Sequence, residues 1–275
     1  MPEAFFERDG DRYLPGELTR GPWDPDHQHA GPPAALIGRA VERLPADAER
    51  VVGRITFEIL RPVPIAPLTV TAGVVRPGRR VELVEASLAA GDETAIRATA
   101  WRLRRADVEV AGELTSAGGG GDAATSASTL RPGFVPPGPE RGEASGFFPT
   151  GQEVGYHTAM DYRFVAGAFL EAGPATVWMR PRHPLVAGSE TSPLERVLLA
   201  ADSGNGVSAT LDYERFVFIN VDLTVHLGRM PVGDWVCLDA VTIPERTGIG
   251  ITDTALYDER GPIGRAAQTL LVAGR

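Results

Sequence analysis

The chain has 275 residues, of which 43% are hydrophobic, and its formal net charge at pH 7 is −9. This composition predicts a globular protein with a sizeable buried core and excludes a disordered chain. The acidic balance argues against a nucleic-acid partner, because neutralising phosphates requires clustered Lys and Arg. No apolar run is long enough to cross a bilayer, and the N-terminus has no apolar signal core, so we expect a cytoplasmic protein without a membrane partner.

The single cysteine, Cys237, excludes an intramolecular disulfide and any metal site that needs several cysteines. It lies in an apolar stretch, so a buried and inert thiol is expected. His27 and His29 lie near Asp24 and Asp26, but their irregular spacing favours a polar loop over a metal site. We therefore expect no metal and no cofactor.

The first half of the chain, residues 1–105, predicts one helix followed by consecutive strands. A strand is expected over 5–13. Small and apolar residues after His29 and Gly31 recur at helical spacing and predict a helix over 34–44. Runs rich in Val, Ile and Thr, separated by Pro/Gly turns, predict strands at 51–60, 68–75, 80–89 and 94–104.

Residues 106–145 differ in composition from both flanks. The run Gly118–Gly121 is followed by small residues and then by a cluster of Pro and Gly. Such a segment cannot build a core and predicts a linker or a long surface loop. The glycine run lies away from any strand-to-helix junction, so it is not expected to bind phosphate.

The second half, residues 146–275, repeats the order of the first. Strands are expected at 157–165 and 176–179, before a helix that starts at Pro193 and extends through Ala201. Ser192 can cap this helix, and Glu195 completes a capping box. Four more strands are expected at 216–227, 234–243, 250–257 and 264–272. The repeated order predicts an α+β fold of two tandem hotdog units, each an antiparallel sheet wrapped around a long central helix.

The two halves can be overlaid on each other. Pro64 falls on Pro231 with a shift of 231 − 64 = 167 residues, and this shift places Trp101 on Gln268 to within about a residue. Ala35 falls near the place of Asp202. At these matched positions an acid and an amide occur only in the second half. We therefore expect one working site there and one degenerate site in the first.

Three short runs resemble the double-hotdog acyl-CoA thioesterase family: 198–204, 218–226 and 264–269. The segment 29–35 also resembles the start of that family's first helix, and the resemblance covers nearly the whole chain outside the linker. It implies that Asp202, Asn220 and Gln268 are catalytic and position the water that hydrolyses an acyl-CoA to free acid and CoA. Asn220 stands where some family members have Thr, and it offers an amide but no hydroxyl.

The residues themselves allow two interpretations of Asp202. It follows an apolar helical run, where a carboxylate loses hydration unless a polar group meets it. Alternatively, it only marks the end of the helix before a glycine-rich turn. As a general base it would accept a proton from the water, while a direct attack that forms an anhydride stays open.

The thioester carbonyl needs hydrogen-bond donors that stabilise its developing negative charge. The start of the first helix, at His29 and Gly31, is the predicted substrate-binding place. His29 could be an auxiliary donor, although a solvent-exposed loop histidine is the favoured interpretation.

Other functions remain as alternatives. A non-catalytic protein that binds acyl-CoA or a lipid-like ligand would have the same fold. A hotdog hydratase ranks lower, because the second helix has no His in its first turns, and a serine hydrolase is disfavoured because no G-x-S-x-G motif occurs. We expect a homodimer that covers exposed sheet edges. Lipid metabolism, polyketide release and CoA salvage are all compatible roles.

Overall fold

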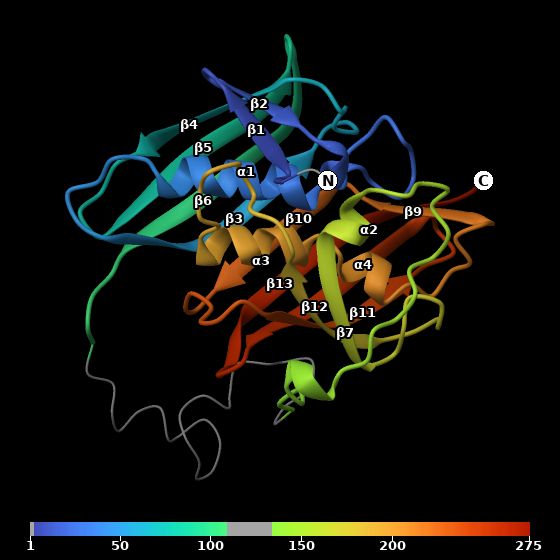
Figure 1. Ribbon diagram of the computed structural model, residues 1–275. Helices are drawn as coiled ribbons and strands as arrows, with labels where there is room; N and C mark the ends of the chain where they lie inside the picture. Colours follow the sequence, from blue (N-terminus) through green and yellow to red (C-terminus); the bar gives the residue numbers. More distant parts are fainter. Residues whose placement is uncertain (1–2, 109–133) are drawn as a thin grey trace.

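In the computed structural model, the described residues, 3–108 and 134–275, form a 13-stranded sheet whose paired strands run antiparallel (Figure 1). The N-terminal half supplies β1 (Phe6–Asp9), β2 (Arg12–Pro15), β3 (Arg50–Ile59), β4 (Leu68–Arg76), β5 (Val81–Ala90) and β6 (Glu93–Arg104). The C-terminal half supplies β7 (Met160–Ala166), β8 (Ala175–Pro181), β9 (Phe216–Asn220), β10 (Asp222–Leu227), β11 (Val236–Pro244), β12 (Ile249–Asp258) and β13 (Gly261–Gly274).

The strand order keeps the two halves apart and joins them in the middle. It runs β1-β2-β4-β5-β6-β3-β10-β13-β12-β11-β8-β7, and β9 pairs with β13 beside β10. The junction is therefore the antiparallel pair of β3 and β10, one strand from each half.

Most predicted strands lie where the sequence patterns place them, but three predictions were wrong in detail. The strand expected over 5–13 is two strands, because Gly10 has a φ of +64° and makes a tight turn between them. The strand expected over 216–227 is interrupted at Val221, between β9 and β10. The strand expected from His157 begins only at Met160, since the short helix α2 (Tyr156–Ala159) precedes it.

The helices α1 (Gly31–Glu42) and α3 (Pro193–Ala201) lie against each other on one face of the sheet. The predicted capping box is present in α3, where Ser192 Oγ accepts from the N–H of Glu195 and the Glu195 carboxylate accepts from the N–H of Ser192. The second helix begins at Pro193 and ends at Ala201, as predicted, although its 9 residues do not make the long central helix expected of the fold. One more turn, α4 (Gly204–Val207), follows after Asp202 and Ser203. Among the described residues, single turns of 3₁₀-helix occur at Glu17–Thr19 and Pro139–Arg141.

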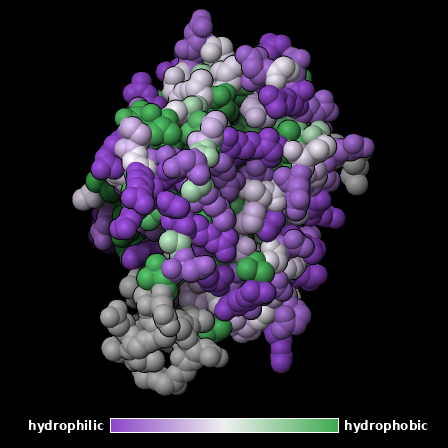
Figure 2. Space-filling view, turned by 90° about the vertical axis from the view of Figure 1, so that its left-hand side faces the viewer, coloured by the Kyte–Doolittle hydropathy of each residue, from purple (hydrophilic) through white to green (hydrophobic). Residues whose placement is uncertain are grey.

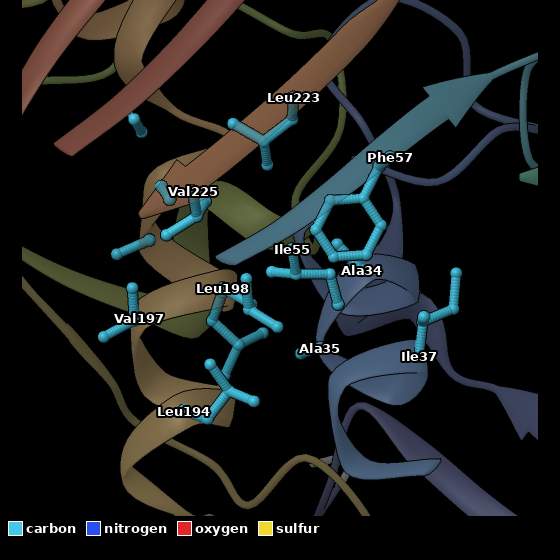
Figure 3. Close-up of a cluster of buried hydrophobic side chains, with 14 of the residues drawn as sticks. Ala34, Ala35, Ile37, Ile55, Phe57, Leu194, Val197, Leu198, Leu223 and Val225 are labelled. Atoms are coloured by element: carbon cyan, nitrogen blue, oxygen red, sulfur yellow. The ribbon is translucent and has the colours of Figure 1, made fainter. Parts of the chain in front are cut away.

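The core lies between the helix pair and the central strands (Figure 3). Small residues of α1 and branched residues of α3 face each other, and β3 and β10 close the cluster from the sheet side. The labelled members are Ala34, Ala35, Ile37, Leu194, Val197, Leu198, Ile55, Phe57, Leu223 and Val225. Burial of these apolar side chains, at roughly 25 cal/mol per Å², holds the two halves together.

A buried ion pair links the two helices at the end of α3 far from Asp202. Arg39 Nη1 lies 2.9 Å from Glu195 Oε1, and these side chains are only 4% and 2% exposed. Arg39 also donates to Ser189 Oγ, and Ser192 Oγ donates to Glu42. These polar contacts fix the antiparallel alignment of α1 and α3.

Strand pairing fixes how the halves correspond. At their junction Thr56 faces Thr224, a shift of 224 − 56 = 168, and the same shift relates the pairs Val70–Leu88 and Leu238–Leu256. The overlay predicted from sequence is therefore one residue short, and the counterpart of Gln268 is Ala100, not Trp101. A slip of one residue reverses the face of a strand. Ala100 and Gln268 are both buried, whereas Trp101 lies on the outer face beside Arg76.

The predicted linker, 106–145, lies largely outside the described residues. Its described C-terminal part packs on the outer face of the sheet, where Phe134 contacts Tyr257 and the Pro137 carbonyl accepts from Trp178 Nε1 at 2.7 Å. Cys237 belongs to the same small cluster and is fully buried, as predicted. Burial and the nearby Asp239 raise the pKa of its thiol well above the usual value, so the thiol stays protonated.

The surface agrees with the charged composition. The face seen in Figure 2 is largely hydrophilic, and hydrophobic side chains occur there in small separate groups. Within residues 3–108 and 134–275, no helix is both long and apolar enough to span a membrane.

Candidate active site

Asp202 lies in a cavity of about 590 Å³ that residues of both halves line. The N-terminal half contributes the segment before α1 and the end of β3. The C-terminal half contributes the end of α3, the junction of β9 and β10, and an aromatic segment before β7. The chief lining residues are Trp23, His29, Ile59, Phe147, Phe148, Phe169, Asp202 and Asn220.

The end of α3 carries the carboxylate of Asp202 into this cavity. Asp202 directly follows the last helical residue and is only 4% exposed. Asp202 therefore ends the helix and also lines the cavity. A carboxylate buried this far requires polar partners.

Asn220 supplies the first partner. Its Nδ2 donates to Asp202 Oδ1 at 2.9 Å and to the carbonyl of Asp222 at 3.2 Å. Both N–H groups of the amide are used on acceptors, which fixes the direction in which the amide faces. The carbonyl oxygen of Asn220 is then left as an acceptor beside the carboxylate.

His29 supplies the second partner. Its Nδ1 lies 3.1 Å from Asp202 Oδ2, and the imidazole is only 14% exposed, so the favoured interpretation of a solvent-exposed loop histidine was wrong. The backbone N–H of His29 donates to the carbonyl of Thr19, which holds the loop against the protein. The ring stacks on Tyr156 at 3.7 Å with an interplanar angle of 9°.

Asp202 and Gly31 both contact the same ring nitrogen of His29. The N–H of Gly31 also points at His29 Nδ1, at 3.1 Å, and one ring nitrogen cannot accept from Gly31 and donate to Asp202 at once. When Asp202 is ionised, the proton lies on Nδ1 and is donated to Oδ2. Burial lowers the pKa of His29, an effect that the charge of Asp202 partly offsets, so the imidazole is neutral at pH 7.

This lowered pKa gives a pH-dependent contribution to stability. Between the pKa of the folded state and the ordinary value of 6.5, the unfolded chain binds more protons at His29, so the free energy of unfolding falls as the pH drops. His29→Gln should flatten that fall relative to wild type in thermal unfolding measured from about pH 7 to about pH 4. Exposed His226→Gln is the control, and an equal flattening there would contradict the assignment.

Gly31 lies where α1 starts against the end of α3. A Cβ at this position would lie 2.6 Å from the carbonyl oxygen of Leu199, so only glycine allows this approach. Pro32 and Pro33 have no N–H, and the N–H of Ala34 donates within the helix. The amide of Gly31 is therefore the one in this first turn that faces the site.

Gln268 meets the backbone of Asp202, not its carboxylate. Its Nε2 donates to the carbonyl of Asp202 at 3.2 Å, and its Oε1 accepts from the N–H of Asn205 at 3.1 Å. The side chain is 3% exposed and lies beneath the turn between α3 and α4. A Cβ on Gly204 would lie 2.9 Å from Gln268 Oε1 and 2.7 Å from Thr254 Oγ1, which explains the glycine in this turn.

Sequence reasoning assigned no role to two residues of the site. Tyr156 and Ser203 lie within hydrogen-bond distance of each other next to Asp202. Ser203 belongs to the run 198–204, but only Asp202 was singled out there, and Tyr156 belongs to none of the runs. His27 Nδ1 lies 3.0 Å from Asp24 Oδ2 at the surface. In the part of the chain that the structure describes, no cluster of three or more His, Cys, Asp or Glu has the arrangement of a metal site.

Two protein-family models match the sequence, one over each half of the chain. Residues 133–272 match the acyl-CoA thioesterase C-terminal domain, and residues 19–103 match the acyl-CoA thioesterase N-terminal domain. No curated protein matches the sequence.

Similar solved structures share the fold at low sequence identity. A hotdog-fold protein from Alicyclobacillus acidocaldarius has a TM-score of 0.71 at 16% identity, over 98% of this chain and 95% of that one. The acyl-CoA thioesterase II TesB2 from Mycobacterium marinum has a TM-score of 0.63 at 14% identity, over 98% and 94%. A TesB protein from Mycobacterium avium subsp. paratuberculosis has 0.64 at 14% identity, over 98% and 95%.

Proposed function

The chain belongs to the acyl-CoA thioesterase family, and on that premise we propose that Asp202 is the general base of its thioester hydrolysis. The observation that carries this proposal is the buried carboxylate between Asn220 and His29 in a cavity formed by both halves. A ligand-binding protein has no need of such a carboxylate, so the catalytic reading is favoured over the non-catalytic one.

The reaction needs one water and one acceptor for its proton. In our proposal the carbonyl oxygen of Asn220 accepts one hydrogen bond from the water, and the Asp202 carboxylate takes its other proton as the water oxygen attacks the thioester carbon. The C–S bond then breaks, and the thiolate of CoA receives the proton. Free acid and CoA are the products.

His29 holds the carboxylate of Asp202 in one orientation for this step. By donating from Nδ1 to Oδ2, it orients the carboxylate and leaves Oδ1 beside Asn220. When Asp202 takes up the proton, the nearby amide of Gly31 can donate to the developing oxyanion, because backbone N–H groups at a helix start favour negative charge. His29 and Gly31 thus have substrate-binding roles.

We propose that Gln268 acts on the water indirectly. Its amide has a backbone partner on each side of the turn that carries Asp202, so it holds the position of the base. Gln268→Ala should lower kcat roughly tenfold, less than loss of the base itself, with little change in KM. Thr254→Val, which alters the same buried turn without touching Asp202, is the comparison; an equal loss there would indicate general disruption of the turn.

The residues that line the cavity differ in exposure. Phe148 and Phe169 are only 8% exposed, whereas Leu60 and Val221 are 51% and 44% exposed beside Arg61. We propose that the acyl group lies toward the buried aromatic end and that CoA leaves past the exposed end, where Arg61 meets its phosphates.

We further propose that the chain is two fused hotdog units with one working site, a boundary region at about 106–145 and units at 1–105 and 146–275. At the other end of the helix pair, the ion pair of Arg39 and Glu195 fills the interior. The single active site at Asp202 follows from this difference. A cytoplasmic homodimer is our proposal for its state in the cell.

A thiol-release assay across saturated acyl-CoAs of increasing chain length tests the function. We expect release of CoA from at least one chain length, at a rate proportional to enzyme. If none of them yields free CoA while the same acyl-CoAs bind in calorimetry, the chain is a binding protein and the proposal is wrong.

A further inference from the structure

Tyr156 donates a hydrogen bond to a backbone carbonyl at the end of α3. The last four carbonyls of a helix have no partner within the helix. The N–H of Ser203, four residues after Leu199, donates to Ala200 instead. The carbonyl of Leu199 accepts from the hydroxyl of Tyr156 at 2.5 Å.

The same hydroxyl also fixes the residue after Asp202. Tyr156 has a single hydroxyl proton and donates it to Leu199, so its oxygen must accept from the Oγ–H of Ser203, which lies 3.0 Å away. Burial raises the pKa of Tyr156, which keeps this proton in place. Leu199 precedes Asp202 by three residues and Ser203 follows it, so the phenol contacts the chain on both sides of the base, at a backbone carbonyl and at a side-chain hydroxyl.

The ring of Tyr156 holds the other member of the pair. It stacks on the imidazole of His29 at 3.7 Å and nearly parallel, and His29 Nδ1 lies 3.1 Å from Asp202 Oδ2. Tyr156 itself is 2% exposed and packs against Phe5 on the N-terminal strand segment. One rigid side chain therefore touches both the segment before α1 and the end of α3.

We propose that Tyr156 is a positioning residue for hydrolysis, which sets the distance between Asp202 and His29 through its hydroxyl and its ring. This inference rests on the proposed role of Asp202. The two contacts have separate functions. The hydroxyl places the carboxylate, and the ring keeps the imidazole in its plane and away from water.

Two substitutions separate these functions. Tyr156→Phe removes the hydroxyl and keeps the ring, so kcat should fall about tenfold with KM changed by less than about twofold. Tyr156→Leu also removes the stacking, so the pKa of His29, followed by NMR of its imidazole, should rise toward its ordinary value. In Tyr156→Phe that pKa should stay as in wild type.

Tyr13→Phe is the matched control. Tyr13 is partly buried on β2, where its ring packs edge-on against Phe6, and it does not line the cavity that holds Asp202. We expect kcat of Tyr13→Phe within about twofold of wild type. Equal losses in the two Phe variants, or a Tyr156→Phe enzyme as fast as wild type, would overturn the proposal.

The outcome is separable from that of the proposed function. If wild type releases no CoA, the function is wrong, while the titration of His29 still reports whether Tyr156 holds the imidazole. If wild type is active and Asp202→Asn is not, a fully active Tyr156→Phe enzyme would contradict the proposed role of Tyr156 and leave that of Asp202 standing. Should Tyr156→Leu fail to fold, the kinetics of the two Phe variants decide.

Discussion

Asp202→Asn is expected to lower kcat for acyl-CoA hydrolysis by about 10²–10⁴-fold while the fold stays intact. The substituted side chain has the same shape and can keep both contacts: its carbonyl oxygen accepts from Asn220, and its amide donates to His29 Nδ1, which is free to accept when the other ring nitrogen holds the proton. Only the ability to take a proton from the water is lost, so KM should change little.

The measurement is steady-state release of CoA at saturating substrate, with thermal unfolding to confirm the folded state. Asp253→Asn is the control, because this acid lies on the outer face and pairs with Arg265. Turnover of Asp202→Asn within about tenfold of wild type would remove Asp202 from the mechanism. Hydrolysis in ¹⁸O-labelled water separates the two chemistries: a general base leaves Asp202 unlabelled, whereas an anhydride whose Asp202 carbonyl is attacked by water leaves label in its carboxylate.

Arg39→Met should destabilise the protein by about 3–5 kcal/mol, because it leaves the Glu195 carboxylate buried without its partner. The capping contact of Glu195 with Ser192 cannot replace the lost charge, since a backbone N–H carries only a partial one. The free energy of unfolding from denaturant titration measures the effect.

The double variant Arg39→Met with Glu195→Met gives the decisive comparison. Removing both charges leaves no unpaired ion, so its stability should lie much closer to wild type than that of the single variant. If the double variant is at least as unstable as Arg39→Met, the loss comes from packing between the helices and not from an unpaired charge. Arg61→Met, which breaks an exposed ion pair with Glu93, should change stability by less than about 1 kcal/mol.

Local chemistry in the sequence was enough to predict most of the elements. Ser192, Pro193 and Glu195 predicted where α3 begins, because capping depends only on neighbouring residues. The alternation of β-branched residues placed most strands of the sheet, and turns at Gly and Pro separated them. The breaks at Gly10 and Val221 were missed, since a short turn or an interrupted strand changes that pattern very little.

The contents of the site depended on the resemblance as much as on pattern. Asp202, Asn220 and Gln268 were named from three short runs that resemble the thioesterase family. Asp202 and Asn220 do meet, at 2.9 Å, while Gln268 reaches the backbone of Asp202 instead of its carboxylate. Their roles in catalysis stay predictions until the variants are measured.

What the sequence by itself determined was the order of helices and strands, the two halves and the residue types available for hydrolysis. Only the tertiary structure decided that His29 meets Asp202 across 202 − 29 = 173 residues, that Tyr156 stacks on His29, and that Ala100 is the counterpart of Gln268. The physical reason is that contacts between distant segments depend on strand register and helix packing. A shift of one residue reverses the face of every side chain on a strand, and local sequence does not encode that shift.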